Sequence, residues 1–386
     1  MLKFSVLLPT RDRLELLKSA IDSVRSQEYQ NWEIIVADNC SKGDIGSYVR
    51  TLSDDRIVYS RSDIALTVTD NWNVANNLAT GDYIVMLGDD DGLVPHYFDE
   101  CLNVIEKFNY PEVLNYSAYI YVQPNVIPSQ PNGSVASAIN YFSFMKGLEE
   151  PRLLSKEVKE QMVRNSLNFE FSFGFNMQYY LYSRAFVEKL RQFGEFYQGP
   201  YPDYYTANMM MLVSESIIVV PKELVIIGVT PKSYGYYYHN NIEKEGMEFH
   251  NTGKYREQAP LSIKKKLCSV SEMDTAALVT FAIIPEKFPQ RHDLNPSLNG
   301  YYKAVVLRIY NDYAPVEASW MFVKEVLLRV NVEDLIYFLK WAKWAYRKSV
   351  QSRSQSLNTK VLSGPVYLGL GDLISAIDKK KVRLSE

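Results

Sequence analysis

Residues 83–92 read YIVMLGDDDG, an apolar run that ends abruptly in three carboxylates. A short apolar run followed by glycine is typical of a buried parallel strand. Asp89, Asp90 and Asp91 would then lie at the carboxyl end of the strand, on the edge where α/β sheets bind ligands. Because side chains alternate along an extended backbone, we expect Asp89 and Asp91 to share one face and Asp90 to point away.

Converging carboxylates repel each other unless a cation lies between them. All-oxygen donors favour hard divalent ions, so the acids predict an Mg²⁺ or Mn²⁺ site that handles phosphate groups. A solvated acidic turn, or a helix N-terminus stabilised by negative charge, remains the structural alternative. A calcium loop counted from Asp89 is excluded, because Leu93 and Val94 occupy the places of a ligand and of the required glycine.

The composition describes an ordinary globular chain of 386 residues, with 47% hydrophobic and 23% charged residues and a net charge of -3. This length predicts one large catalytic domain and a smaller second unit. The balanced charge gives no indication of a nucleic-acid partner. Cys40, Cys101 and Cys268 lie far apart without metal spacing, which predicts neither disulfides nor a zinc site. We expect a cytoplasmic protein, with peripheral contact at the inner face of the membrane as an open option.

The first segments form a βαβ pattern. Strands are predicted at 4–8 and 32–37, joined by a helix whose apolar residues from Leu14 to Val24 recur at helical spacing. A right-handed unit of this kind places Thr10 and Asp38 at neighbouring strand ends. An acid there can accept a hydrogen bond from a base or a ribose, although a turn or cap role for Asp38 is equally open.

The remaining pattern is that of an α/β chain. The asparagine-rich helix predicted at 70–79, which contains Asn77, suggests a polar face near a ligand or a solvated face. The proline-rich segment 123–150 is interpreted as an irregular excursion over the sheet edge, with a lid as one function open to it. Further predicted helices are 44–52, 95–108, 156–167, 184–193 and 204–213, and further strands are 56–59, 113–117, 179–182, 216–220 and 224–229.

Five pieces, in this order and spacing, resemble family-2 glycosyltransferases of the GT-A fold: SVLLPT at 5–10, WEIIVADN at 32–39, ANN at 75–77, TGDYI at 80–84 and DDD at 89–91. The resemblance covers roughly the first 120 residues. It implies a GT-A Rossmann-like, mostly parallel sheet and an inverting transferase that uses a nucleotide-diphosphate sugar, most simply a UDP-sugar.

The resemblance also implies site residues. The donor would be bound by Pro9, Thr10, Arg11, Asp38, Asn77, Asp89 and Asp90, with Asp38 near the base. Where the family commonly has Tyr-Asn after Pro-Thr, this chain has Arg11-Asp12. The guanidinium of Arg11 would then stack on the nucleotide base in place of an aromatic ring, and the identity of the base is left undetermined. The metal would be held by Asp91, Asp89 and a late histidine, His239, for which a structural role is the alternative.

Inversion requires a group that removes the proton of the attacking hydroxyl, and a carboxylate is the simplest acceptor. Similar transferases carry an acid before a helix in the acceptor half, which corresponds to Asp203. Glu195 is the nearest rival, and capping of the helix is the structural alternative for Asp203.

The predicted domains are a GT-A domain at 1–245 and a helical C-terminal extension at 246–386. A helix at 335–346 has one apolar and one basic face, which fits either packing or an anionic membrane surface. The expected function is transfer of a sugar to a saccharide or lipid-linked glycan acceptor in surface polysaccharide synthesis. A silent binding scaffold of the same fold is the alternative. A sugar-1-phosphate nucleotidyltransferase is disfavoured because residues 8–13, LPTRDR, contain no glycine.

Overall fold

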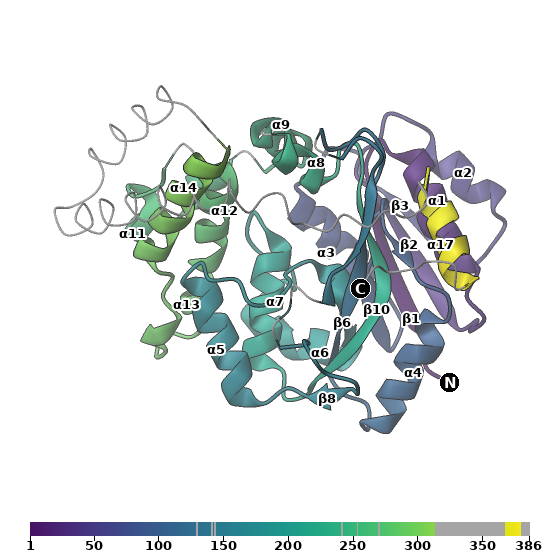
Figure 1. The fold of residues 1–386 in the computed structure, drawn as a ribbon, viewed down its shortest axis with the longest axis horizontal. Helices are drawn as coiled ribbons and strands as arrows, with labels where there is room; N and C mark the ends of the chain where they lie inside the picture. Colours follow the sequence, from purple (N-terminus) through teal and green to yellow (C-terminus); the bar gives the residue numbers. More distant parts are fainter. Residues whose placement is uncertain are drawn as a thin grey trace.

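The computed structural model describes residues 1–128, 130–139, 142, 144–240, 242–252, 254–268, 271–312 and 367–379. A single ten-stranded sheet runs through these residues, and helices cover its faces (Figure 1). The strands are β1 (Phe4–Thr10), β2 (Trp32–Asp38), β3 (Ile57–Arg61), β4 (Tyr83–Met86), β5 (Gly92–Leu93), β6 (Val113–Val122), β7 (Ser134–Ser137), β8 (Arg152–Leu153), β9 (Tyr180–Ser183) and β10 (Ile217–Val229).

The strand order is β3-β2-β1-β4-β9-β6-β10-β5, with β7 paired to β6 and β8 paired to β10. Strands β3, β2, β1 and β4 are parallel. Strand β9 is antiparallel to both β4 and β6, and β10 is parallel to β6. The long strands therefore share one direction, and their carboxyl ends lie on one edge. The predicted α/β fold class is confirmed.

Amphipathic helices bury their apolar faces on this sheet. In α1, Leu17, Ile21 and Val24 are buried at helical spacing, as expected from the sequence. The helices up to the last strand are α1 (Leu14–Arg25), α2 (Ile45–Thr51), α3 (Val68–Leu78), α4 (Tyr97–Lys107), α5 (Lys156–Leu167), α6 (Arg184–Leu190) and α7 (Pro202–Val213), with 3-10 turns at Met177–Tyr179 and Arg191–Phe193.

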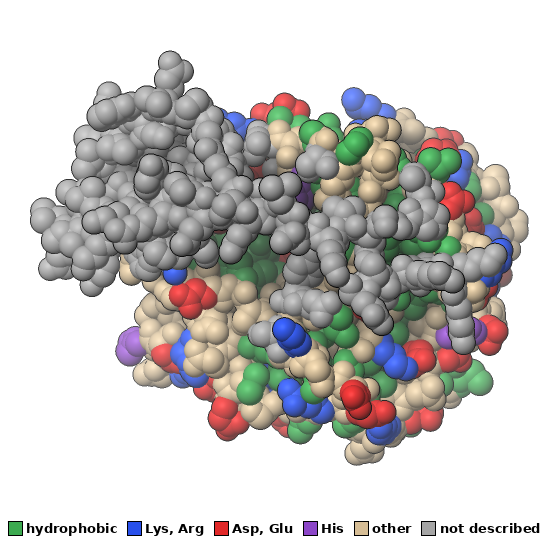
Figure 2. All heavy atoms as spheres, viewed as in Figure 1, with side chains coloured by type: hydrophobic (Ala, Val, Ile, Leu, Met, Phe, Trp, Pro, Cys, Tyr) green, Lys and Arg blue, Asp and Glu red, His purple; other side chains and the backbone are tan. Residues whose placement is uncertain are grey.

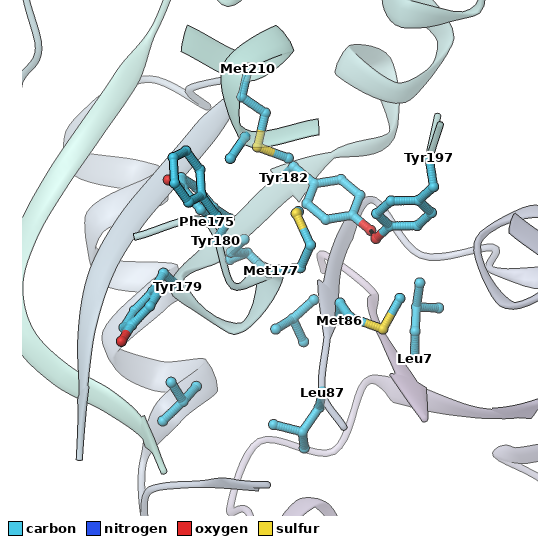
Figure 3. Close-up of a cluster of buried hydrophobic side chains, with 14 of the residues drawn as sticks. Leu7, Met86, Leu87, Phe175, Met177, Tyr179, Tyr180, Tyr182, Tyr197 and Met210 are labelled. Atoms are coloured by element: carbon cyan, nitrogen blue, oxygen red, sulfur yellow. Dashed lines mark hydrogen bonds between the residues drawn. The ribbon is translucent and has the colours of Figure 1, made fainter. Parts of the chain in front are cut away.

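The core between β4, β9 and α7 is rich in methionine and tyrosine. Figure 3 shows the rings of Tyr182 and Tyr197 meeting at their hydroxyl groups, with Met86 nearby. The two hydroxyl oxygens are 2.9 Å apart, so each buried tyrosine has a hydrogen-bond partner. Many of the tyrosines of this chain are therefore core residues.

Three local expectations are corrected by the structure. Segments 216–220 and 224–229 form one strand, β10, because register shifts between Val220 and Val225 absorb the extra residues. Segment 123–150 contains β7, which pairs with β6, and its described residues do not line the cavity described below. Strand β4 ends at Met86, so the three acids lie in a turn and their side chains do not alternate as on a strand.

The described residues after Val229 are helical. They form α8 (Tyr234–His239), α9 (Glu243–Phe249), α10 (Tyr255–Gln258), α11 (Leu261–Lys264), α12 (Glu272–Phe281), α13 (Ile284–Lys287), a 3-10 turn at His292–Leu294, α14 (Leu298–Asp312) and α17 (Leu370–Asp378). Helix α17 returns to the first half of the chain and lies beside α1 (Figure 1). The predicted boundary at 245 falls within α9, and the division into two domains stays a prediction.

The predicted basic helix at 335–346 lies outside the described residues. Among the described helices, none combines the length and apolar character needed to cross a bilayer. On the face drawn in Figure 2, basic and acidic side chains are interspersed with apolar ones over the described part of the surface.

Candidate functional site

A cavity of about 370 Å³ opens at the carboxyl edge of the sheet. Its walls come from the ends of β1 and β10, the acidic turn after β4, the first turn of α7 and the segment after α9. Its charged and ionisable lining residues are Arg11, Arg13, Asp90, Asp91, Asp203 and His250. The topology therefore brings acids from two distant parts of the sequence to one place, where α/β folds bind ligands.

Asp89 lies beneath the cavity and does not line it. It is fully buried, and the hydroxyl group of Thr10 donates a hydrogen bond of 2.6 Å to its Oδ2. The guanidinium of Arg13 forms an ion pair with the same carboxylate, through Nη2 on Oδ1 and through Nε on Oδ2 at 3.1 Å. Asp89 is thus the counter-ion of Arg13.

Asp90 and Asp91 line the cavity together. Asp90 accepts a hydrogen bond of 2.9 Å from Thr230. Asp91 accepts hydrogen bonds from the backbone N–H groups of Gly88 and Gly228, at 2.9 and 2.8 Å, and one of 2.6 Å from Gln178. Neutral donors therefore orient Asp91 without cancelling its charge.

Burial dominates the acid–base behaviour of these carboxyl groups. Burial raises the pKa of Asp91, and the neighbouring charge of Asp90 raises it further. Burial also raises the pKa of Asp89, although the positive charge of Arg13 opposes that rise. A cation placed against Asp91 would favour its ionised form, as expected of a site that binds charge.

The predicted donor-binding residues are only partly brought together. Pro9, Thr10 and Arg11 line the cavity, and the guanidinium of Arg11 donates a hydrogen bond of 2.6 Å to the carbonyl of Phe249, whose ring lies 5.5 Å away. Asp38 is paired with Thr10 in register, as expected, but does not line the cavity. Its carboxylate accepts hydrogen bonds from Tyr59 at 2.7 Å and from the N–H of Ser41 at 2.9 Å.

The asparagines of α3 divide between the cavity and the surface. Asn77 is exposed and does not line the cavity, whereas Asn71 does, together with Asn39 at the end of β2. Helical spacing places the side chains of Asn71 and Asn77 on different faces of α3. The sequence pattern identified a polar helix near the site but could not select the residue that faces it.

Asp203 lies in the first turn of α7 and lines the cavity. Pro202 occupies the start of the helix, and the structure shows no side-chain cap at Tyr201, so the expected helix start at 204 is two residues late. The N–H of Tyr204 donates a hydrogen bond of 3.0 Å to the Asp203 carboxylate. Burial nevertheless raises the pKa of Asp203 to about 6. The rival residue Glu195 is exposed and does not line the cavity.

The histidine that lines the cavity is His250, which sequence reasoning missed. His239 is exposed at the end of α8 and is not among the lining residues. The Nε2 atom of His250 is buried and has no hydrogen-bond partner among the described residues. Burial, together with the charges of Arg13 and Arg11, lowers the pKa of His250 to about 3. The imidazole is therefore neutral at pH 7 and can donate its lone pair to a metal.

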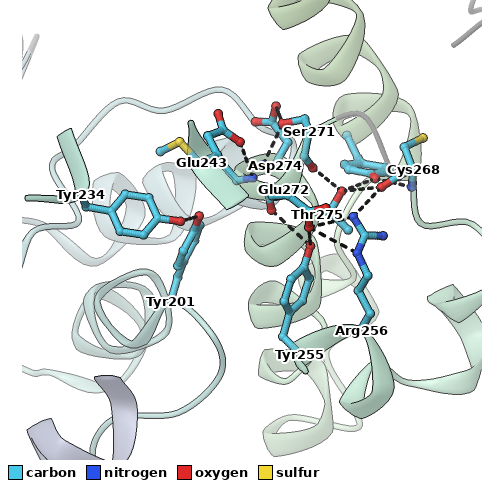
Figure 4. A network of polar contacts seen from close by, with 12 residues as sticks. Tyr201, Tyr234, Glu243, Tyr255, Arg256, Cys268, Ser271, Glu272, Asp274 and Thr275 are labelled. Carbon is cyan, nitrogen blue, oxygen red and sulfur yellow. Dashed lines mark hydrogen bonds and ion pairs between the residues drawn. The ribbon is translucent and has the colours of Figure 1, made fainter. Parts of the chain in front are cut away.

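Helix α12 supports the wall that carries Asp203. The N–H of Tyr201 donates a hydrogen bond of 3.2 Å to Thr280, and Figure 4 shows the hydroxyl groups of Tyr201 and Tyr234 in contact. At the start of α12, Glu272 forms an ion pair of 3.0 Å with Arg256. The helical C-terminal part thus helps to fix the position of the first turn of α7.

The lining residues fit a divalent ion in part. Asp90 and Asp91 offer oxygen ligands, and the Nε2 of His250 lacks a partner. Within the part of the chain that the structure describes, no three or more His, Cys, Asp or Glu residues are grouped as a ready-made cage. This is consistent with Mg²⁺ chemistry, in which one or two carboxylates are completed by substrate phosphates and water.

Residues 5–151 match the model of Glycosyl transferase family 2. Over 144 residues the chain is 33% identical to WcaA of Escherichia coli, which is named for colanic acid biosynthesis. The aligned residues make up 36% of this chain and 52% of WcaA. Over 95 residues it is 38% identical to a GalNAc(5)-diNAcBac-PP-undecaprenol beta-1,3-glucosyltransferase of Campylobacter jejuni. These residues make up 24% of this chain and 31% of that enzyme. The family expected from the sequence is confirmed over the matched residues.

A solved structure of S. aureus TarS in complex with UDP-GlcNAc is 14% identical, with a TM-score of 0.49 and coverage of 90% of this chain and 92% of that one. The match to the two curated relatives is shorter. This chain spans about half of WcaA and about a third of the C. jejuni enzyme.

Proposed function

We propose that the protein is an inverting glycosyltransferase that moves a sugar from a nucleoside-diphosphate donor to a hydroxyl group of a glycan acceptor. One observation carries the proposal: Asp90, Asp91 and Asp203 line a single cavity at the carboxyl edge of a sheet whose first part matches the model of Glycosyl transferase family 2. Two arginines, Arg11 and Arg13, line the same cavity and favour an anionic ligand.

In this proposal Asp203 is the general base. The acceptor oxygen attacks the anomeric carbon on the face opposite the diphosphate, the bond to the diphosphate breaks, and Asp203 takes the proton of the acceptor hydroxyl. A base with a pKa of about 6 is ionised at pH 7 and still binds a proton well, which suits this step. The position of Asp203 at the cavity wall, with its neighbour Tyr204 donating to one oxygen, leaves the other oxygen for the acceptor.

A divalent ion, Mg²⁺ or Mn²⁺, would be held by Asp91 and Asp90 and completed by donor phosphates and water, and it would neutralise the diphosphate as it leaves. His250 lines the same cavity and is the candidate for a further ligand. The neutral imidazole of His250 and the oriented carboxylate of Asp91 support this set. It differs from the set expected from the sequence, because Asp89 is engaged by Arg13 and His239 lies away from the cavity. A metal role for His239 stays a prediction.

UDP-sugars are the first donors to test, and a lipid-linked glycan is the proposed acceptor. The name of the C. jejuni relative specifies a PP-undecaprenol glycan as its acceptor, and WcaA is named for polysaccharide biosynthesis. A lipid-linked acceptor would require the protein to work at a membrane surface, so we propose peripheral association for this chain.

The test is metal-stimulated release of nucleoside diphosphate from UDP-, GDP- and dTDP-linked sugars, with and without undecaprenol-linked glycans. We expect the protein to turn over one class of donor with Mn²⁺ or Mg²⁺, and we expect EDTA to stop this turnover. Purified, folded protein that neither hydrolyses nor transfers any of these donors, and that binds no nucleoside diphosphate, would refute the proposal. Binding of UDP without turnover would instead indicate a silent scaffold.

A further inference from the structure

Arg13 is placed as a permanent cation within the acidic cluster. It precedes α1 directly, and its side chain is only 13% exposed. Its guanidinium contacts Asp89 through two nitrogens, and Nη1 lies 3.4 Å from Oδ2 of Asp90. Burying such a group is costly unless it is paired, so these contacts fix both the position and the charge of the arginine.

Asp89 and Thr10 hold Arg13 in place through a shared carboxylate. The hydroxyl of Thr10 donates to the carboxylate oxygen that also accepts from Nε of Arg13. Asp89 does not line the cavity, whereas Arg13 does. The pair therefore presents the cation to the cavity and keeps the carboxylate behind it.

Each cavity arginine has a buried nitrogen without a hydrogen-bond partner among the described residues, Nε in Arg11 and Nη1 in Arg13. The Nη1 of Arg11 already donates to the carbonyl of Phe249. The Nη1 of Arg13 is buried and makes no hydrogen bond with the described residues, although it lies near Asp90. The Nη1 atom therefore has an ion-pair contact but no hydrogen bond, and phosphate oxygens match the planar fork of arginine.

The negative charge that gathers in the cavity favours a cation that is always present there. Asp90, Asp91 and Asp203 line it, and a diphosphate brings further negative charge to the same wall. A divalent ion provides positive charge only when it is bound, whereas the guanidinium of Arg13 lies at this wall at all times, with Asp89 behind it as its counter-ion. We propose that Arg13, oriented by Asp89, binds the diphosphate of the donor directly and supports nucleotide binding in the absence of metal. This inference rests on the proposed function.

The experiment measures binding of UDP, uridine and inorganic pyrophosphate by calorimetry in EDTA and again with Mn²⁺. Replacing Arg13→Gln should weaken UDP and pyrophosphate binding in EDTA by about 10- to 100-fold, the range expected for hydrogen bonds to charged groups. Uridine binding should change by less than about twofold, because it contains no phosphate. The control Lys18→Gln removes an exposed charge from the same helix and should leave all three affinities within about twofold.

Two further variants separate binding from folding. Arg13→Gln leaves Asp89 buried without its counter-ion, so the double variant Arg13→Gln/Asp89→Asn removes both charges and leaves the net charge of the site unchanged. Arg13→Lys keeps a charge but loses the planar fork. We expect the double variant to fold as judged by circular dichroism and still to bind UDP weakly in EDTA, and Arg13→Lys to be intermediate.

The outcomes distinguish this inference from the function on which it rests. If native protein binds UDP and the folded double variant binds it equally well in EDTA, Arg13 does not contact the diphosphate and the inference is wrong. An equal loss of uridine and UDP binding would show a structural role and would also overturn it. Native protein that binds no nucleoside diphosphate and no pyrophosphate, with or without Mn²⁺, would overturn both proposals.

Discussion

Replacing Asp203 with asparagine should abolish sugar transfer and stabilise the protein at neutral pH. The carboxyl group has an ordinary pKa of 3.8, which burial raises to about 6 in the folded chain. A shift of about two pKa units corresponds to at most about 3 kcal/mol of folding free energy. Because Asp203 is partly exposed at the cavity wall, we expect about 1 to 3 kcal/mol.

The sign and the pH window follow from the raised pKa. Folding disfavours the ionised form of Asp203, so the native protein loses stability as the pH rises from about 4 to about 6 and carries the full cost above pH 6. Asparagine carries no such cost, and its carbonyl can still accept the hydrogen bond from the N–H of Tyr204. The stability difference should therefore be largest near pH 8 and close to zero near pH 4.

Urea unfolding at pH 8, 6 and 4.5 measures this difference, and nucleoside diphosphate release with donor, acceptor and Mn²⁺ measures transfer. The native rate should fall about tenfold per pH unit below pH 6, where the base becomes protonated. The exposed Glu195 provides the control, because Glu195→Gln should change neither stability nor transfer. Full activity in Asp203→Asn, or equal stability of the two proteins at every pH, would refute the assignment of Asp203.

Three further predictions concern other parts of the cavity and fold. His250→Ala should weaken UDP binding in Mn²⁺ about tenfold and His239→Ala should not, as calorimetry would show; the reverse result would restore His239 as the ligand. Leu373→Ala should lower the urea-unfolding free energy by about 2 to 4 kcal/mol, because Leu373 is fully buried on α17, and an unchanged value would mean that α17 is not docked. Gly228→Ala should lower both the melting temperature and the UDP affinity, because a methyl group there would overlap the backbone carbonyl of Asp90; unaltered values would contradict this close approach of the two backbones.

The first half of the fold could be predicted because its signals are local. The apolar runs of β1, β2 and β4 and the helical spacing in α1 and α5 each determine one element without reference to the rest of the chain. The direction of the βαβ crossover then places Thr10 beside Asp38, as the register confirms. Register shifts within β10 have no comparable local signal, so one bulged strand was interpreted as two.

The sequence predicted which elements carry the site, but it did not predict the partner of each side chain. The acidic turn was expected at the carboxyl edge, Asp203 was expected to act in the same reaction, and the structure brings both to one cavity. The partner of each acid depends on tertiary contacts: nothing in the sequence indicates that Arg13 engages Asp89, or that Tyr59 engages Asp38. The choice between His239 and His250 likewise depends on how α8 and α9 turn back toward β1.

The most direct test of the proposed donor site is a crystal structure of the protein with UDP and Mn²⁺. We predict density for the diphosphate in the cavity, with the ion against Asp91 and a phosphate oxygen within hydrogen-bonding distance of Arg13. Asp203 should face the open side of the cavity where the acceptor hydroxyl would enter. A nucleotide bound elsewhere, or a cavity that stays empty at saturating UDP and Mn²⁺, would contradict the proposed function.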